Sequence, residues 1–173
     1  IASRDKVKLF LRLGSNETND YYEYEMPLTP SSVTSGSADE LWQTHQMVDG
    51  EVRDLNSINV VLGALNQLKV SRDESAFPTD SVYWSDDNGV PLSPSVQEFA
   101  PPGTRLGIKG TPSLGRLNTV VLGIRNASEP IVDGLDNVRP EDILDDVTVW
   151  TNEMRVSGYD ETNGWAAMAN ADI

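Results

Sequence analysis

A single histidine limits the catalytic chemistry open to this chain. His45 is the only one among the 173 residues, so a Ser-His-Asp triad or a histidine-based metal site would have to include it. No Gly-x-Ser-x-Gly elbow accompanies it, and the chain has no cysteine to act as a nucleophile, a thiolate ligand or half of a disulfide. We therefore interpret His45 as a surface or structural residue and predict that the protein is not an enzyme.

Two glutamates have the spacing of an acid and base pair. Glu23 and Glu25 lie two residues apart in an alternating segment, which places both on one face of a strand. A glycosidase uses such a pair, with its carboxylates about 5 to 10 Å apart in a cleft. Two glutamates on the outer side of an amphipathic strand are more often simply exposed to solvent. We expect exposure here, and keep glycosidase activity as the third hypothesis.

Two acidic turns offer oxygen ligands for a hard cation. Asp86-Asp87-Asn88-Gly89 is one of them, and the stretch from Asp160 to Gly164 is the other. Neither has the twelve-residue spacing of an EF-hand, and turn chemistry accounts for both. The prediction is no metal and no cofactor, with calcium at Asp86, Asp87 and Asp160 as the alternative.

Three tryptophans are candidates for ligand or partner contacts. Trp42, Trp84 and Trp165 could stack on sugar rings, as tryptophans do in carbohydrate-binding modules. Burial in a core or an interface is the more frequent fate of tryptophan. A surface carbohydrate-binding module is thus the second hypothesis, and it requires a row of exposed aromatic rings.

The charge balance excludes several partners. Against 27 Asp and Glu stand 13 Lys and Arg, which gives a formal net charge of −14. Such a surface repels phosphate backbones and anionic lipids, so we expect no nucleic-acid binding and no docking on membranes. The longest apolar stretch, Val60 to Leu65, is far below the roughly 20 residues that span a bilayer. No part of the chain is expected to insert into a membrane.

Alternating residues near the start predict a β-hairpin, and leucine spacing further on predicts a helix. The segment from Lys6 to Leu28 divides at Gly14 into two alternating runs, typical of half-buried strands. From Asp54 to Val70 the apolar residues recur at spacings of three and four, with Asp54 or Asn56 as the cap. They are Leu55, Ile58, Leu62, Leu65 and Leu68.

The remaining pattern favours a mainly β fold. Further strands are predicted at Ser81 to Trp84, Thr104 to Lys109, Asn118 to Arg125 and Asp146 to Ser157. The third of these is nearly all apolar, which is typical of a strand buried on both faces or at the centre of a sandwich. Five or six strands with one helix predict an antiparallel, jelly-roll-like β-sandwich with a helical insertion at about 54–70. Residues 1–173 are interpreted as one soluble domain.

Four stretches together resemble one family. They are Val7 to Leu28, Leu41 to Asp73, Arg105 to Asn126 and Val149 to Ala167. The last contains the most specific motif, VW-x-NE-x-R-x-x-G-[FY]-DE-x-x-GWAA, while Thr111, Thr151 and Met154 depart from the family pattern. In this order the stretches are similar to a segment of the SprA or Sov family, the outer-membrane translocons of type IX secretion in Bacteroidota.

The resemblance implies a place and a role. It implies a non-catalytic insert domain, excised from a giant outer-membrane barrel, that supports protein export across the outer membrane and gliding motility. The implied partners are the parent barrel, secreted cargo proteins and a PorV-like shuttle or plug protein. The implied location is the outer membrane, with the domain exposed at the cell surface; we prefer the extracellular mouth of the pore to the periplasmic one.

Overall fold

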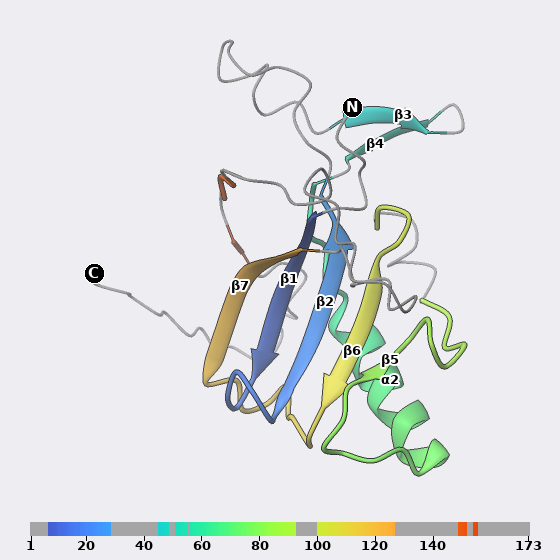
Figure 1. Cartoon of the computed structure of the whole chain (residues 1–173), viewed down its shortest axis with the longest axis vertical. Helices are drawn as coiled ribbons and strands as arrows, with labels where there is room; N and C mark the ends of the chain where they lie inside the picture. Colours follow the sequence, from blue (N-terminus) through green and yellow to red (C-terminus); the bar gives the residue numbers. More distant parts are fainter. Residues whose placement is uncertain are drawn as a thin grey trace, which may run out of the picture.

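The computed structural model describes residues 7–28, 45–48, 51–54, 56–92, 100–126, 149–151 and 154–155. These residues form one five-stranded antiparallel sheet with a helix packed on one face, together with a separate two-stranded sheet (Figure 1). The large sheet contains β1 (Val7–Gly14), β2 (Tyr21–Pro27), β5 (Tyr83–Trp84), β6 (Arg105–Lys109) and β7 (Thr119–Asn126), in the spatial order β5-β6-β2-β1-β7. The small sheet pairs β3 (His45–Val48) with β4 (Glu51–Asp54), and the helix is α2 (Leu62–Ser75). A mainly β fold is thereby confirmed.

The predicted hairpin is confirmed as β1 and β2. Its register pairs Leu11 with Tyr24 and closes through a loop in which the Asn16 side chain accepts the backbone N–H of Asn19 at 2.7 Å. Such an Asx turn replaces backbone pairing where the chain reverses. At the loop's base Gly14 lies so close to Asp20 that a Cβ there would be 2.0 Å from the Asp20 carbonyl oxygen. Only glycine fits that approach.

The predicted helix exists, but its limits were wrong. It begins at Leu62 rather than Asp54 and ends at Ser75 rather than Val70. Neither predicted cap is at the N-cap position, because Asp54 lies in β4 and Asn56 also lies well before Leu62; that position is held by Val61, without a side-chain cap bond. Ile58 lies before the helix, in a segment that is neither helix nor strand, and packs against the core from there. Its spacing from Leu62 is nevertheless that of a helix.

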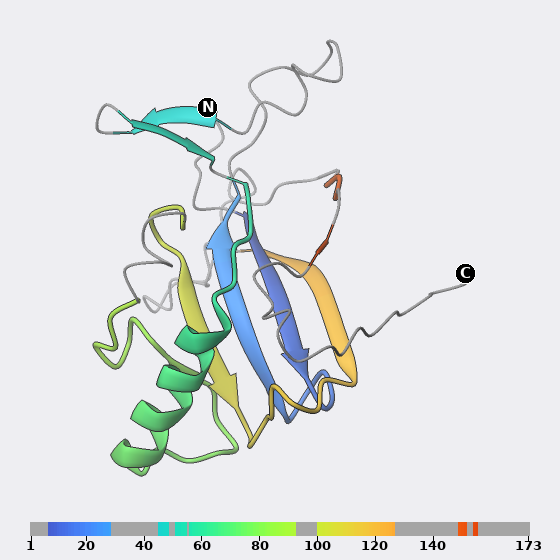
Figure 2. The same cartoon turned by 180° about the vertical axis from the view of Figure 1, so that it is seen from behind.

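The core lies between α2 and one face of the large sheet (Figure 2). The helix contributes three buried apolar residues: Ala64, Leu65 and Leu68. They pack with alternate residues of three strands: Leu9 and Leu11 of β1, Tyr22, Tyr24 and Met26 of β2, and Leu106 and Ile108 of β6. The alternation read from the sequence is thus realised, with the apolar set facing the helix. Because α2 packs on the β6 side, β7 lies at the sheet edge away from it.

The other strand predictions had mixed outcomes. The strand at Thr104 to Lys109 is confirmed within one residue, whereas Ser81 to Trp84 shortens to two residues. The strand at Asn118 to Arg125 also exists, as β7. Its predicted burial was wrong, because β7 lies at the edge of the described sheet and its apolar side chains stay partly exposed. Of Asp146 to Ser157, only 149–151 and 154–155 are described, and these five residues are not in a strand.

The predicted β-sandwich requires a second large sheet packed on the first. In the part of the chain that the structure describes, the large sheet faces a helix rather than another large sheet. The jelly-roll-like sandwich therefore stays a prediction. No helix among the described residues is long and apolar enough to cross a membrane.

Candidate functional site

The face of the large sheet turned away from α2 carries a group of charged side chains. We call it the ion cluster, and it consists of Lys8 and Arg12 of β1, Glu23 and Glu25 of β2, Arg105 of β6 and Arg125 of β7. Strand alternation places these residues here, because each lies one position out of phase with the apolar residues that face the helix. Since β2 is the central strand, its two glutamates lie in the middle of this face.

Glu23 is held from two sides. Arg12 donates from Nε to Oε2 at 2.7 Å, and Arg125 donates from Nη2 to Oε1 at 2.8 Å. Arg12 also donates to the backbone carbonyl of Glu17 at 2.7 Å. Both carboxylate oxygens of Glu23 are thus occupied by charge-assisted hydrogen bonds, which are among the stronger ones in proteins.

Glu25 has three cationic partners. Lys8 donates to Oε1 at 3.0 Å, Arg105 donates to the same oxygen at 2.8 Å, and Arg125 donates to Oε2. Burial on its own would raise the pKa of Glu25, yet the hydrogen bond from Lys8 and the charge of Arg105 outweigh that effect and hold it below its ordinary value. Glu25 is therefore ionised at neutral pH.

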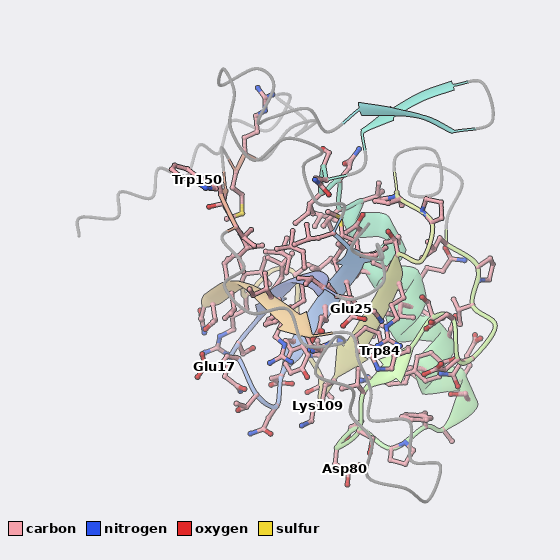
Figure 3. All side chains as sticks on the ribbon, turned by 45° about the horizontal axis from the view of Figure 1, so that its top comes forward. Glu17, Glu25, Asp80, Trp84, Lys109 and Trp150 are labelled. Atoms are coloured by element: carbon pink, nitrogen blue, oxygen red, sulfur yellow. The ribbon has the colours of Figure 1, made fainter. Side chains whose placement is uncertain are left out.

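Aromatic rings frame the cluster. The Arg12 guanidinium lies 4.2 Å from the ring centre of Tyr21, and that of Arg105 lies 3.9 Å from the ring centre of Trp84. Arg125 passes over Phe10, 5.0 Å from its ring centre. Through these cation–π contacts the aromatic rings shield the cations, and the cations in turn shield the two carboxylates. Figure 3 shows Glu25 and Trp84 over the same part of the sheet.

The expected exposure of the two glutamates was wrong. Glu23 and Glu25 are both 0% exposed, because the cations and rings above them exclude solvent. A general acid needs a proton at neutral pH and a base needs a free oxygen facing substrate. Glu25 has no such proton, and the oxygens of both residues are already bonded, so this pair has the chemistry of a structural ion cluster.

The acidic turn at Asp86 and Asp87 lies beside the cluster. Its backbone closes through Gly89, whose N–H donates to the Asp86 carbonyl at 3.3 Å, and an Asp86 carboxylate oxygen lies 3.8 Å from Arg105. Among the described residues no three histidine, aspartate or glutamate side chains gather where they could hold a metal ion. Asp160, the third calcium candidate, lies outside the described residues.

Of the three candidate tryptophans, the described residues include only Trp84. Trp84 is half-buried: its ring lies against Gly107, where an added Cβ would be 2.7 Å from the ring, and it carries the Arg105 guanidinium. Trp42 and Trp165 lie outside the described residues. By contrast Trp150 is 78% exposed and lies apart from Trp84 (Figure 3). Trp150 is not among the contact residues predicted from the sequence.

Two further features are His45 and a shallow hollow. His45 begins β3 with Asp54 as its register partner. The hollow, of about 380 Å³, is lined by Asn19, Asp20, Thr79, Asp80, Lys109, Gly110 and Thr111. Asp20 is engaged there, because its carboxylate accepts the backbone N–H of Thr111. Among the described residues, the ion cluster is therefore the candidate functional site.

Sequence reasoning missed the cations of this site. One ion pair of the cluster could have been predicted from the hairpin, because its register pairs Arg12 with Glu23. The pairs made by Arg105 and Arg125 required knowing that β6 and β7 flank the hairpin, which brings these arginines to glutamates 80 and 100 residues away. No local pattern encodes such a pairing.

The described residues define a mainly β module, in which one face of an antiparallel sheet packs on a helix and the other face carries the ion cluster. No group of side chains that could form a metal centre is found among them. The model of the SprA_N family, described as motility related/secretion protein, matches residues 1–173, and the chain belongs to this family. No curated protein and no solved structure matches the chain. The resemblance read from the sequence is thereby confirmed.

Proposed function

We propose that this chain is a non-catalytic domain of the outer-membrane translocon of type IX secretion, where it supports protein export and gliding motility. The observation that carries the proposal is the family match over residues 1–173, to a family described as motility related/secretion protein. The domain acts at the outer membrane, on the cell-surface side of the pore. There it contacts the parent barrel, secreted cargo and a PorV-like shuttle or plug protein.

The ion cluster supports the non-catalytic part of this proposal. Its two carboxylates are paired with cations and closed to solvent, so the best acid and base candidates of the sequence serve to join strands. A domain that contacts large partners needs a rigid surface more than a reactive group. Neither a metal nor a cofactor is part of the proposed role.

The test removes the domain from the full-length protein that carries it. Residues 7–167 are replaced by a Gly/Ser linker, and barrel assembly in the outer membrane, release of a type IX cargo and gliding are scored separately. We expect the barrel to assemble while cargo remains in the periplasm and gliding stops. Normal assembly, release and gliding would show that the domain has no part in secretion.

A second candidate function has one observation in its favour. The exposed indole of Trp150 offers the kind of flat apolar surface on which sugars stack, which supports the carbohydrate-binding alternative. The test is a calorimetric titration of the chain with surface polysaccharides, with Trp150→Ala beside Trp84→Phe. Sugar binding that is lost in the first variant and kept in the second would favour this function. No heat of binding in the unsubstituted chain would remove this candidate.

A further inference from the structure

The two edges of the large sheet differ in a way that has consequences for binding. On one side the sheet ends in β5, a strand of only two residues, which is a common way to shield an edge. On the other side it ends in β7, eight residues long and paired, among the described residues, with β1 alone. In an antiparallel pair every second residue of an edge strand turns its N–H and C=O outward. Among the described residues, β7 therefore presents a row of backbone groups that no neighbouring strand pairs.

Within its own sequence and register, β7 lacks three of the usual features that protect an edge. Its register against β1 is continuous from Thr119 opposite Gly14 to Asn126 opposite Val7, so no bulge twists it away. Its sequence, TVVLGIRN, has no proline and a single charged residue, Arg125, next to its end. Natural edge strands commonly carry proline, inward charges or bulges for this purpose.

The α2 side of β7 is apolar and open. Val120, Leu122 and Ile124 are 49%, 41% and 45% exposed. They continue, across the sheet, the rows of Leu13, Leu11 and Leu9, to which they are register partners. The helix covers the β6 side of this face and leaves β7 beyond it, as Figure 2 shows. Among the described residues, the apolar face of the sheet thus ends in three partly exposed side chains.

The opposite side of β7 is cationic. Arg125 is 36% exposed although it bonds both glutamates of the ion cluster. The cluster holds four cations, Lys8, Arg12, Arg105 and Arg125, against the carboxylates of Glu23 and Glu25 and, 3.8 Å from Arg105, that of Asp86. Arg125 therefore places a partly exposed cation near the end of β7.

We propose that the β7 edge binds an extended segment of another polypeptide as a sixth strand of the sheet. Backbone pairing with β7 supplies the affinity, as in other cases of strand addition. The alternating faces set the specificity: apolar side chains of the segment extend the row formed by Val120, Leu122 and Ile124, and an acidic side chain faces Arg125. The inference stands on the sheet alone and does not depend on the proposed role in secretion.

The test uses the 173-residue chain and a synthetic peptide of about nine residues, the length of an ordinary strand. In the peptide Val and Thr alternate, with one Glu at a central Thr position; a matched peptide carries Gln there. Binding is followed by amide chemical shifts and hydrogen exchange. We expect new exchange protection at the outward amides of β7, and binding of the Gln peptide weaker by about threefold because it lacks the charge facing Arg125.

Two exposed leucines provide a matched pair of variants. Leu122→Lys places a charge on the open apolar row, whereas Leu117→Lys changes a leucine of similar exposure, 38%, that precedes β7. We expect the first to weaken peptide binding by about tenfold and the second by less than about twofold, because only Leu122 loses apolar contact with the added strand. Should Leu122→Lys disturb the fold, Ile124→Lys provides the same comparison.

Several results would overturn the proposal. Equal peptide binding by Leu122→Lys and Leu117→Lys would place the peptide elsewhere, and no binding at millimolar peptide would remove the site. Outward β7 amides already protected in the peptide-free monomer would show that the chain covers this edge itself. The same protection together with the mass of a dimer would show a second copy there.

Discussion

Arg125 of β7 and Glu23 of β2 form an ion pair of 2.8 Å that passes over β1, the strand between them. Through its other terminal nitrogen, Arg125 also bonds Glu25. One side chain therefore joins an edge strand to the central strand in addition to the backbone ladder. The ion cluster braces the sheet on the face opposite α2, where there is no apolar core among the described residues.

The first prediction concerns the charge of Glu25. Replacing it by glutamine leaves the side chain in place but removes the charge that Lys8, Arg105 and Arg125 share. We expect Glu25→Gln to lower the free energy of unfolding by about 2 to 3 kcal/mol, measured by urea denaturation, because it weakens buried charge-assisted bonds. Glu17→Gln, at an exposed position, is the control and should change it by less than about 0.5 kcal/mol. Equal effects would mean that the cluster adds no stability.

The second prediction is a pH dependence. The pKa of Glu25 is lower in the folded protein than in the unfolded chain, so its stabilising contribution is present above the unfolded value. As pH falls below about 4.3, the ordinary pKa of glutamate, the unfolded chain takes up the proton first and this contribution declines. The difference in unfolding free energy between the unsubstituted chain and Glu25→Gln should therefore shrink from pH 7 toward pH 3. A constant difference would contradict the lowered pKa.

The third prediction contrasts two glycines. A Cβ at Gly14 would meet the backbone of Asp20 and Tyr21, while a Cβ at Gly63 in α2 would meet nothing within 4 Å. We expect Gly14→Ala to prevent the hairpin from closing and to destabilise the protein by more than about 3 kcal/mol, which backbone strain of this kind reaches. Gly63→Ala should instead raise the melting temperature, through a gain of about 0.5 to 1 kcal/mol in helix propensity. Thermal unfolding followed by circular dichroism measures both, and a shift of the same sign in the two variants would be inconsistent with this geometry.

The fourth prediction tests the helix register. Leu65 is 1% exposed and Leu62 is 47% exposed, although both fit the leucine spacing of the sequence. Truncating a buried leucine to alanine costs about 2 to 5 kcal/mol, so Leu65→Ala should unfold at much lower urea concentration. For Leu62→Ala we expect a loss below about 1 kcal/mol, because this side chain already contacts water. Similar losses would place the helix in another register.

Local sequence was enough to predict what depends on neighbouring residues. The alternation in β1 and β2, with Gly14 between them, predicted a hairpin with its apolar face inward, because side-chain direction in a strand has a period of two. The leucine spacing predicted a helix. Because Ile58 fits the same spacing, the helix was predicted to include it, although Ile58 contacts the core from outside the helix. The family, too, was predicted from motifs along the chain and is confirmed.

Tertiary structure decided which strands are neighbours and, through that, what the site is. Glu23 and Glu25 read as exposed outer residues, since nothing near them in sequence shows that β6 and β7 bring Arg105 and Arg125 over them. The apolar composition of β7 predicted a strand buried on both faces or at the centre of a sandwich, yet its place at the edge of the described sheet leaves those side chains partly exposed. Composition sets what a strand can bury, while only the order of strands in space sets what covers it.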